Sequence, residues 1–183
     1  MKRIVDYVCA LEPGAVPPEK FPTPSGKGVR TIFSHDSSEA AAWLSFLIKN
    51  YAKLAETTVF LCADPLRHLS EIPMPQEIWD DERPMAYLGV RPDADKPWPF
   101  PMASMHLNLH TKVWGDAPPA AGMFRVGGQF FARSCLIRQH ARQHYEAYYA
   151  LRETPHFNHL LEGSWHTVFA TYETSCKEAK NEV

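Results

Sequence analysis

The stretch that most constrains the fold is a helical pattern followed at once by an apolar strand pattern. In residues 35–54, HDSSEAAAWLSFLIKNYAKL, apolar residues recur every three or four positions, as on the buried face of an amphipathic helix. Asp36 is the expected N-cap, with Glu39 three residues later as in a capping box. Residues 57–64, TTVFLCAD, have the pattern of a buried strand that ends at Asp64. A continuous apolar strand directly after a helix predicts a βαβ unit and a parallel sheet.

The remaining patterns predict further elements around that unit. We expect strands and helices in the order strand 3–11, strand 30–34, the helix and strand above, strand 104–114, strand 123–134, helix 135–153 and helix 156–175. The 16 prolines gather mainly in stretches that we interpret as long loops over 12–28 and 65–103. The sequence therefore predicts an α/β fold, a single domain over 1–175 with a mostly parallel (mixed) central sheet flanked by helices, and a flexible tail over 176–183.

Composition narrows the classes of function. A net charge of -2 over 183 residues gives no basic footprint, which disfavours a nucleic-acid binder. No stretch approaches the roughly 18 consecutive apolar residues that a membrane span requires, and the N-terminus lacks the pattern of a secretory signal. The four cysteines are scattered without a CxxC pair, so we expect small buried thiols in a reducing compartment. These observations predict a cytoplasmic protein that does not span a membrane.

Acidic residues in two loops are candidate ligands. Asp64 ends a buried strand, and ligands of open parallel sheets bind beyond the carboxyl ends of the strands. An acid there can hold a metal or a ribose, although Asp is also an ordinary turn residue before proline. His68 follows closely and could join such a site. Asp93-Ala-Asp95 could hold a divalent cation against a diphosphate, but its proline-flanked position favours a solvated loop.

Two other segments carry polar groups whose use depends on the predicted strands. In SMHLNLHTKVW (104–114) apolar and polar residues alternate, which predicts a half-buried strand with His106, Asn108 and His110 on one face. Histidines four apart on a strand are about 13 Å apart, too far to share one metal easily, so a polar surface is expected. The Gly127-Gly128 pair indicates either a bulge or a close approach of a ligand or another backbone, and Gln129 could bind a substrate hydroxyl.

The last predicted helix contains HLLEGSWHTVF (159–169), in which Glu162 lies at the edge of an apolar face. His159 and His166 fall on the same helical stripe as Glu162. The simplest interpretation is a surface charge paired with histidine, worth a few tenths of a kcal/mol. A metal site would need ligands from another element.

Three segments together resemble a known family. EAAAWLSFLIKNYAKLAETTVFLCADP, GGQFFARSCLIRQHARQHYEAYY and LLEGSWHTVF are similar to an uncharacterised domain-of-unknown-function family, which itself resembles small glycosyltransferases with the nucleotide-sugar-binding (GT-A-like) fold. The likeness covers about residues 36–72 and 122–170 and consists of four motifs in the same order. The matching positions are Glu39, Asn50, Tyr51, Phe60, Asp64, Pro65, His68, Gly128, Gln129, Phe130, Glu162 and Trp165. The chain departs from the family at its first strand, YVCALEPG, where Glu12 alone could replace the family's acidic turn.

The resemblance implies an enzyme that transfers a sugar from a nucleotide-activated donor to a hydroxyl acceptor. Asp64 would bind a divalent cation, Mn²⁺ or Mg²⁺, or the donor diphosphate. Glu162 would be the base that removes the acceptor proton, which requires a partly buried site to raise its pKa. The residues implied to contact substrate are His68, Gly128, Gln129, Trp165 and Glu39.

Two alternatives stay open. One is a non-catalytic descendant of the fold that binds a carbohydrate or a protein through the aromatic residues of loop 73–101, namely Trp79, Trp98 and Phe100. The other is a metal-dependent hydrolase, which would need Asp64, His68 and one of His106 or His110 to converge within ligand distance.

Overall fold

The fold is built on a five-stranded mixed sheet. The structure is a computed structural model that describes residues 4–17, 21, 23–89, 95–97, 102–115, 123–125 and 128–169. The strands of the sheet are β1 (Val5–Leu11), β2 (Val29–His35), β3 (Thr57–Leu61), β4 (Met85–Tyr87) and β7 (Phe130–Arg133), in the spatial order β2-β1-β3-β7-β4. β1, β2 and β3 are parallel, as expected, whereas β7 runs antiparallel to both β3 and β4.

Side chains alternate between two hydrophobic clusters, one on each face of the sheet. Val8 of β1 and Phe60 of β3 point into the larger cluster, which contains Trp43 and most of the buried helix residues. Tyr7 and Val59, one position earlier in the same strands, point into the smaller cluster on the opposite face. Every residue of β1 and β3 is buried because both faces of these strands are covered.

Helix α1 (Glu39–Asn50) forms where the periodicity predicts it and continues into the 3₁₀ turn η1 (Tyr51–Lys53). Its N-cap is Ser38, whose Oγ accepts a hydrogen bond from the Ala41 backbone N at 3.3 Å. The expected N-cap, Asp36, instead accepts from the Tyr149 hydroxyl at 2.7 Å. The prediction was therefore two residues too early, and Glu39 opens the helix.

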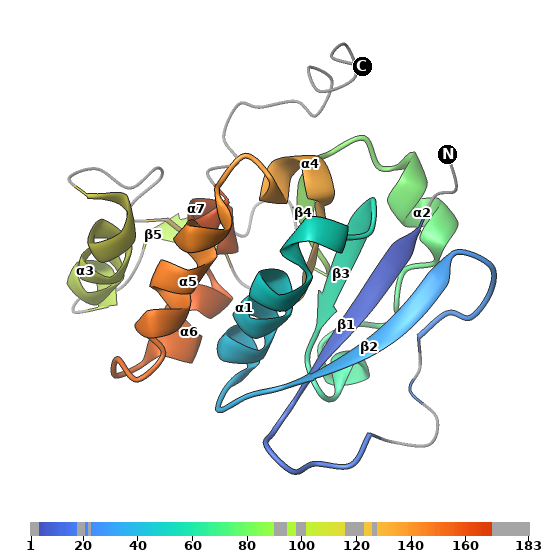
Figure 1. The fold of residues 1–183 in the computed structure, drawn as a ribbon, viewed down its shortest axis with the longest axis horizontal. Helices are drawn as coiled ribbons and strands as arrows, with labels where there is room; N and C mark the ends of the chain where they lie inside the picture. The colour runs from blue at the N-terminus through green and yellow to red at the C-terminus, as the bar shows by residue number, and fades with distance from the viewer. Residues whose placement is uncertain are drawn as a thin grey trace.

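Helices cover the larger cluster on one side of the sheet. Alongside α1 lie α5 (Arg142–Ala150) and α6 (Phe157–Glu162), while α3 (Met102–Trp114) packs against α5 and α6 (Figure 1). The core between these helices and the sheet is aromatic. Trp43 contacts Phe60, Phe130 and Trp165 with ring centroids 5.5–5.8 Å apart, and its Nε1 donates to the Leu61 backbone O.

Helix α3 replaces the strand that we predicted over 104–114. Its sequence alternates only over a few residues, and the same residues also satisfy the i, i+3, i+4 spacing of a helix. The helix buries His106, Leu109 and His110 on one face and leaves Leu107 44% exposed on another. The two histidine rings therefore lie in contact with tilted planes and centroids 4.4 Å apart, instead of about 13 Å apart.

The two C-terminal helices that we predicted are each broken in two. The first divides into α4 (Ser134–Ile137) and α5, so Ser134 begins a helix and is not its N-cap. Carbonyls freed by this break accept hydrogen bonds from tyrosines, Ile137 from Tyr145 and His140 from Tyr51. The second divides into α6 and α7 (Trp165–Val168) at Gly163 and Ser164, and residues beyond 169 lie outside the described part.

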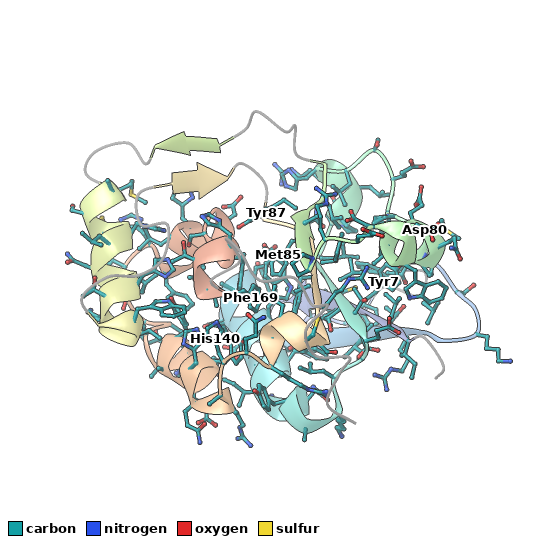
Figure 2. The ribbon with its side chains drawn as sticks, turned by 90° about the horizontal axis from the view of Figure 1, so that it is seen from above. Tyr7, Asp80, Met85, Tyr87, His140 and Phe169 are labelled. Carbon is teal, nitrogen blue, oxygen red and sulfur yellow. The ribbon has the colours of Figure 1, made fainter. Side chains whose placement is uncertain are left out.

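Short elements occupy the rest of the chain. The predicted loop over 65–103 contains the 3₁₀ turn η2 (Pro65–Arg67), helix α2 (Pro75–Asp80) and β4. Helix α2 covers the smaller cluster, on the side of Tyr7 and Asp80 in Figure 2, while His140 lies across the sheet from them. The predicted strand over 123–134 is two strands, because β6 (Met123–Arg125) pairs with β5 (Asp95–Pro97) in a separate ribbon.

The cysteines differ from one another. Cys9 is a buried free thiol, as expected, whereas the free thiol of Cys62 is only half-buried. Cys135 is disulfide-bonded, so the expectation of four free thiols is wrong at this position. Within the described residues, no helix has the length and apolar character needed to cross a bilayer.

Candidate functional site

The candidate site lies at the carboxyl edge of the three parallel strands. β1, β2 and β3 end there at Leu11, His35 and Leu61, and α1 begins at the same edge after β2. Because β7 is antiparallel, its amino end reaches this edge, where Phe130 pairs with Phe60. The residues before β7 therefore join the loops that follow the parallel strands.

Glu39 and Glu162 come together beside Gly128. Glu39 is the first residue of α1 and Glu162 the last of α6, and Asn158 Oδ1 links the two helices by accepting from the Ala40 backbone N at 2.8 Å. A Cβ placed on Gly128 would lie 2.9 Å from Cγ of Glu162 and 3.3 Å from Oε1 of Glu39. The glycine thus leaves the space that both glutamate side chains occupy.

The two carboxylates share an electrostatic environment. Burial, together with the nearby negative charge of Glu162, raises the pKa of Glu39 to about 7. The Glu162 side chain is 42% exposed, and its Oε2 lies 3.5 Å from Nδ1 of His159. A carboxyl group that titrates near neutral pH can both accept and donate a proton, which is the requirement for general acid–base chemistry.

Gln129 organises the strand end beside this pair. Its Oε1 accepts from the Cys62 backbone N and its Nε2 donates to the Pro65 backbone O, both at 3.2 Å, and the residue is 3% exposed. The amide thus satisfies two backbone groups of the turn that follows β3. We expected Gln129 to bind a substrate hydroxyl, and the described contacts of its side chain are those to the turn.

Cys62 is the thiol nearest to the carboxylates. Burial raises its pKa to about 11, and the charge of Glu39 contributes, while the Asp64 backbone N–H bond opposes the rise. At neutral pH the thiol is therefore protonated, which makes it a poor nucleophile.

Asp64 and His68 lie at the same edge but are exposed. Asp64 precedes η2, and its backbone O accepts from the Arg67 N, as in an ordinary turn. Among the described residues no group of three or more His, Cys, Asp or Glu side chains has the geometry to hold a metal ion. A Mg²⁺ ion commonly uses one or two carboxylates together with substrate phosphates, so Asp64 stays a candidate ligand for such a shared ion.

Trp165 and His166 support the site from inside. Trp165 is fully buried, with its ring 5.1 Å from Phe130 and 5.9 Å from Phe169. His166, which we placed on the stripe of Glu162, is also buried, and its Nδ1 lies 3.1 Å from the Tyr87 hydroxyl at the end of β4. The break between α6 and α7 thus separates His166 from Glu162, and His159 is the histidine next to the carboxylate.

The histidines of α3 belong to a separate buried cluster. His110 Nδ1 lies 2.5 Å from the Tyr148 hydroxyl, and its Nε2 lies 3.1 Å from Ser164 Oγ. Burial lowers the pKa of His106 to about 4. Asp64 and His68 are exposed at η2 whereas these histidines are buried, so the ligand set that the metal-dependent hydrolase requires does not assemble.

The aromatic loop is described in part. Trp79 lies in α2 and is half-buried against the smaller cluster. Trp98, Phe100 and the first residues of Asp93-Ala-Asp95 lie outside the described residues, as does Gly127. The half-burial of Trp79 gives the binding-loop alternative little support.

Sequence reasoning missed a polar pocket beside the carboxylate pair. The pocket has a volume of about 420 Å³ and lies between the start of α1 and the loop that joins α5 to α6. Its polar lining includes Ser38, Arg152, Thr154, His156, Asn158 and His159. No motif marks these residues, because they come from two segments far apart in the chain. A second pocket of about 290 Å³ lies on the opposite face, between α2 and β4.

Comparison of the chain with protein-family models, with curated proteins and with solved structures returned no match.

Proposed function

We propose that the chain is an acid–base enzyme whose centre is the pair formed by Glu39 and Glu162, and that it transfers a sugar from a nucleotide-activated donor to a hydroxyl acceptor. The observation that supports the acid–base centre is the meeting of both carboxylates at Gly128, with the pKa of Glu39 raised to about 7. The sugar and the nucleotide come from the resemblance to glycosyltransferases.

In this reaction the acceptor oxygen forms a bond to the anomeric carbon of the donor, and the bond from that carbon to the diphosphate oxygen breaks. The acceptor proton passes to the carboxylate pair. General-base catalysis is most effective when the pKa of the base lies near the working pH, which Glu39 satisfies. Glu162 is the more exposed of the two, so it would contact the acceptor while Glu39 holds the proton.

A divalent cation, Mn²⁺ or Mg²⁺, would neutralise the leaving diphosphate. Asp64 is the exposed carboxylate at the strand end that would hold it together with phosphate oxygens. Gln129 bonds the backbone on both sides of Asp64, so it would hold Asp64 in a fixed position at the end of β3.

The proposal is tested by donor turnover. A panel of nucleotide sugars is incubated with the protein and Mn²⁺ or Mg²⁺, with and without hydroxyl acceptors, and nucleotide release is measured. Glu39→Gln and Glu162→Gln should each lower turnover about 100-fold or more, as expected for loss of a general base. Glu56→Gln, at an exposed residue away from the pair, is the matched control. Absence of turnover with every donor, or full activity in both variants, would contradict the proposal.

A further inference from the structure

The polar pocket of about 420 Å³ lies next to the carboxylate pair. Two contacts connect it to the pair. Ser38 lines the pocket and directly precedes Glu39. His159 also lines it, and its Nδ1 lies 3.5 Å from Oε2 of Glu162. The pocket therefore adjoins the start of α1 and shares His159 with the Glu162 side chain.

The hydrogen-bonding groups of the pocket are held in place by backbone contacts. Asn158 Oδ1 accepts from the Ala40 N, which leaves the Asn158 amide NH₂ as a donor. Ser38 Oγ accepts from the Ala41 N, which leaves the Ser38 hydroxyl hydrogen as a donor. Fixed donors of this kind bind a ligand at a smaller entropic cost than mobile ones.

Charge in the pocket is balanced. Arg152 Nε lies 3.5 Å from Oε1 of Glu153, and both residues line the pocket. The Arg152 guanidinium also lies over the Tyr149 ring, 4.5 Å from its centroid. A phosphate or carboxylate would have to compete with Glu153 for the guanidinium. A lining of hydroxyl, amide and imidazole groups around a neutralised ion pair suits an uncharged ligand that both donates and accepts hydrogen bonds.

The backbone of the pocket is strained at one residue. His156 has φ 62 and ψ 14, and it is the one non-glycine residue with positive φ in the described part of the chain. Such a conformation costs a non-glycine residue of this kind free energy and is found preferentially at functional sites. A glycine there would adopt this conformation without that strain, so His156→Gly removes the side chain without disturbing the backbone.

We infer that this pocket is the acceptor subsite and that the acceptor is an uncharged polyhydroxylated compound, a sugar or a polyol. This inference rests on the proposed function, and the link between the two is His159, which lines the pocket and lies beside Glu162. The pocket volume of about 420 Å³ falls within the range of small-molecule sites, roughly 300–1,000 Å³.

The test is direct binding without a donor. Saturation-transfer NMR is recorded with free glucose, mannose, galactose and N-acetylglucosamine, each up to about 50 mM, a range suited to weak acceptors. At least one sugar should bind saturably. Thr154→Val and His156→Gly should weaken that binding about fivefold or more, as loss of a hydrogen bond does. Ser70→Ala, in the pocket on the opposite face, should leave it unchanged.

Two features of the design separate this inference from the proposed function. The binding assay contains no donor and measures no turnover, so failure of the acid–base proposal would leave the binding result intact. His156→Gly should unfold at a temperature no lower than that of the parent protein, so weaker binding cannot be assigned to unfolding. The inference is overturned if none of the four sugars binds, if Thr154→Val and His156→Gly bind as well as the parent, or if inorganic phosphate displaces the sugar.

Discussion

Glu39 and Glu162 are far apart in the sequence, and the side chains of both lie against the open side of Gly128. Two carboxylates at such a place repel each other, and burial raises the pKa of Glu39 to about 7. This repulsion destabilises the folded state. Side chains present only to stabilise the fold would not be expected to repel each other. Its presence at the carboxyl edge of the sheet favours a catalytic use.

The first prediction concerns stability. Because the pKa of Glu39 is higher in the folded than in the unfolded chain, the folded state binds more protons between about pH 4.5 and 7, and stability falls as pH rises through that range. Glu39→Gln removes this loss, so at pH 8 the variant should be more stable than the parent by on the order of 2 kcal/mol, and near pH 4 equally stable. Urea unfolding at pH 4 and pH 8 measures the stability difference at each pH, with Glu56→Gln as the control. Equal stability of the parent and Glu39→Gln at pH 8 would refute the prediction.

The second prediction concerns Gly128. In Gly128→Ala the added methyl group would meet Cγ of Glu162 at 2.9 Å, so that flexible side chain must move away from Glu39. The folded state should lose only about 1 kcal/mol, because Glu162 is partly exposed and can adjust. Turnover should fall by much more than this small loss of stability can explain. Thermal unfolding measures the stability of the variant, and the donor assay measures its turnover. Unchanged turnover would show that the close approach of the carboxylates is not needed.

The third prediction concerns Gln129. Gln129→Leu would leave the Cys62 N and the Pro65 O without their partners in a buried place, at a cost of about 2–4 kcal/mol. Gln76→Leu, in which the glutamine is exposed and bonds only Asp80, should cost less than about 0.5 kcal/mol. Urea unfolding of both variants measures the difference. A Gln129→Leu protein as stable as the parent would show that the Gln129 amide is not needed to stabilise this turn.

The fourth prediction concerns acid. Burial lowers the pKa of His144 to about 4 and, with the charges of neighbouring histidines, that of His110 to about 2. Between about pH 6.5 and 4 the unfolded chain therefore binds more protons, and stability falls as pH falls. His144→Gln should reduce the slope by up to one proton, about 1.4 kcal/mol per pH unit. Identical slopes for parent and His144→Gln would rule out a buried neutral His144.

The sequence predicted the elements whose signals are local. The strands β1, β2 and β3 and helix α1 follow from continuous apolar runs and a clear 3.6-residue period, and they set the carboxyl edge at which Glu39 lies. Helix α3 was missed because six alternating residues fit both periods, and only the burial of His106 and His110 against α5 and α6 decides between them. Tertiary packing overrides such weak local preferences.

The site was predicted in part. The resemblance singled out Glu39, Gly128 and Glu162, and the structure brings these three together. Their contact could not be worked out from spacing, because it depends on β7 running antiparallel beside β3 and on the helix break after Glu162. The pocket at His156 was missed for a similar reason, since a positive φ leaves no mark in the sequence.

The central claim is that Glu39 and Glu162 form one coupled carboxylate pair. The most direct measurement is the ¹³C NMR titration of the Glu39 side-chain carboxyl in the parent protein and in Glu162→Gln. We predict that the parent Glu39 titrates with a pKa of about 7 and that the pKa falls in Glu162→Gln, because the neighbouring charge is gone. A Glu39 pKa near 4.5 in the parent, or the same raised pKa in both proteins, would contradict the claim.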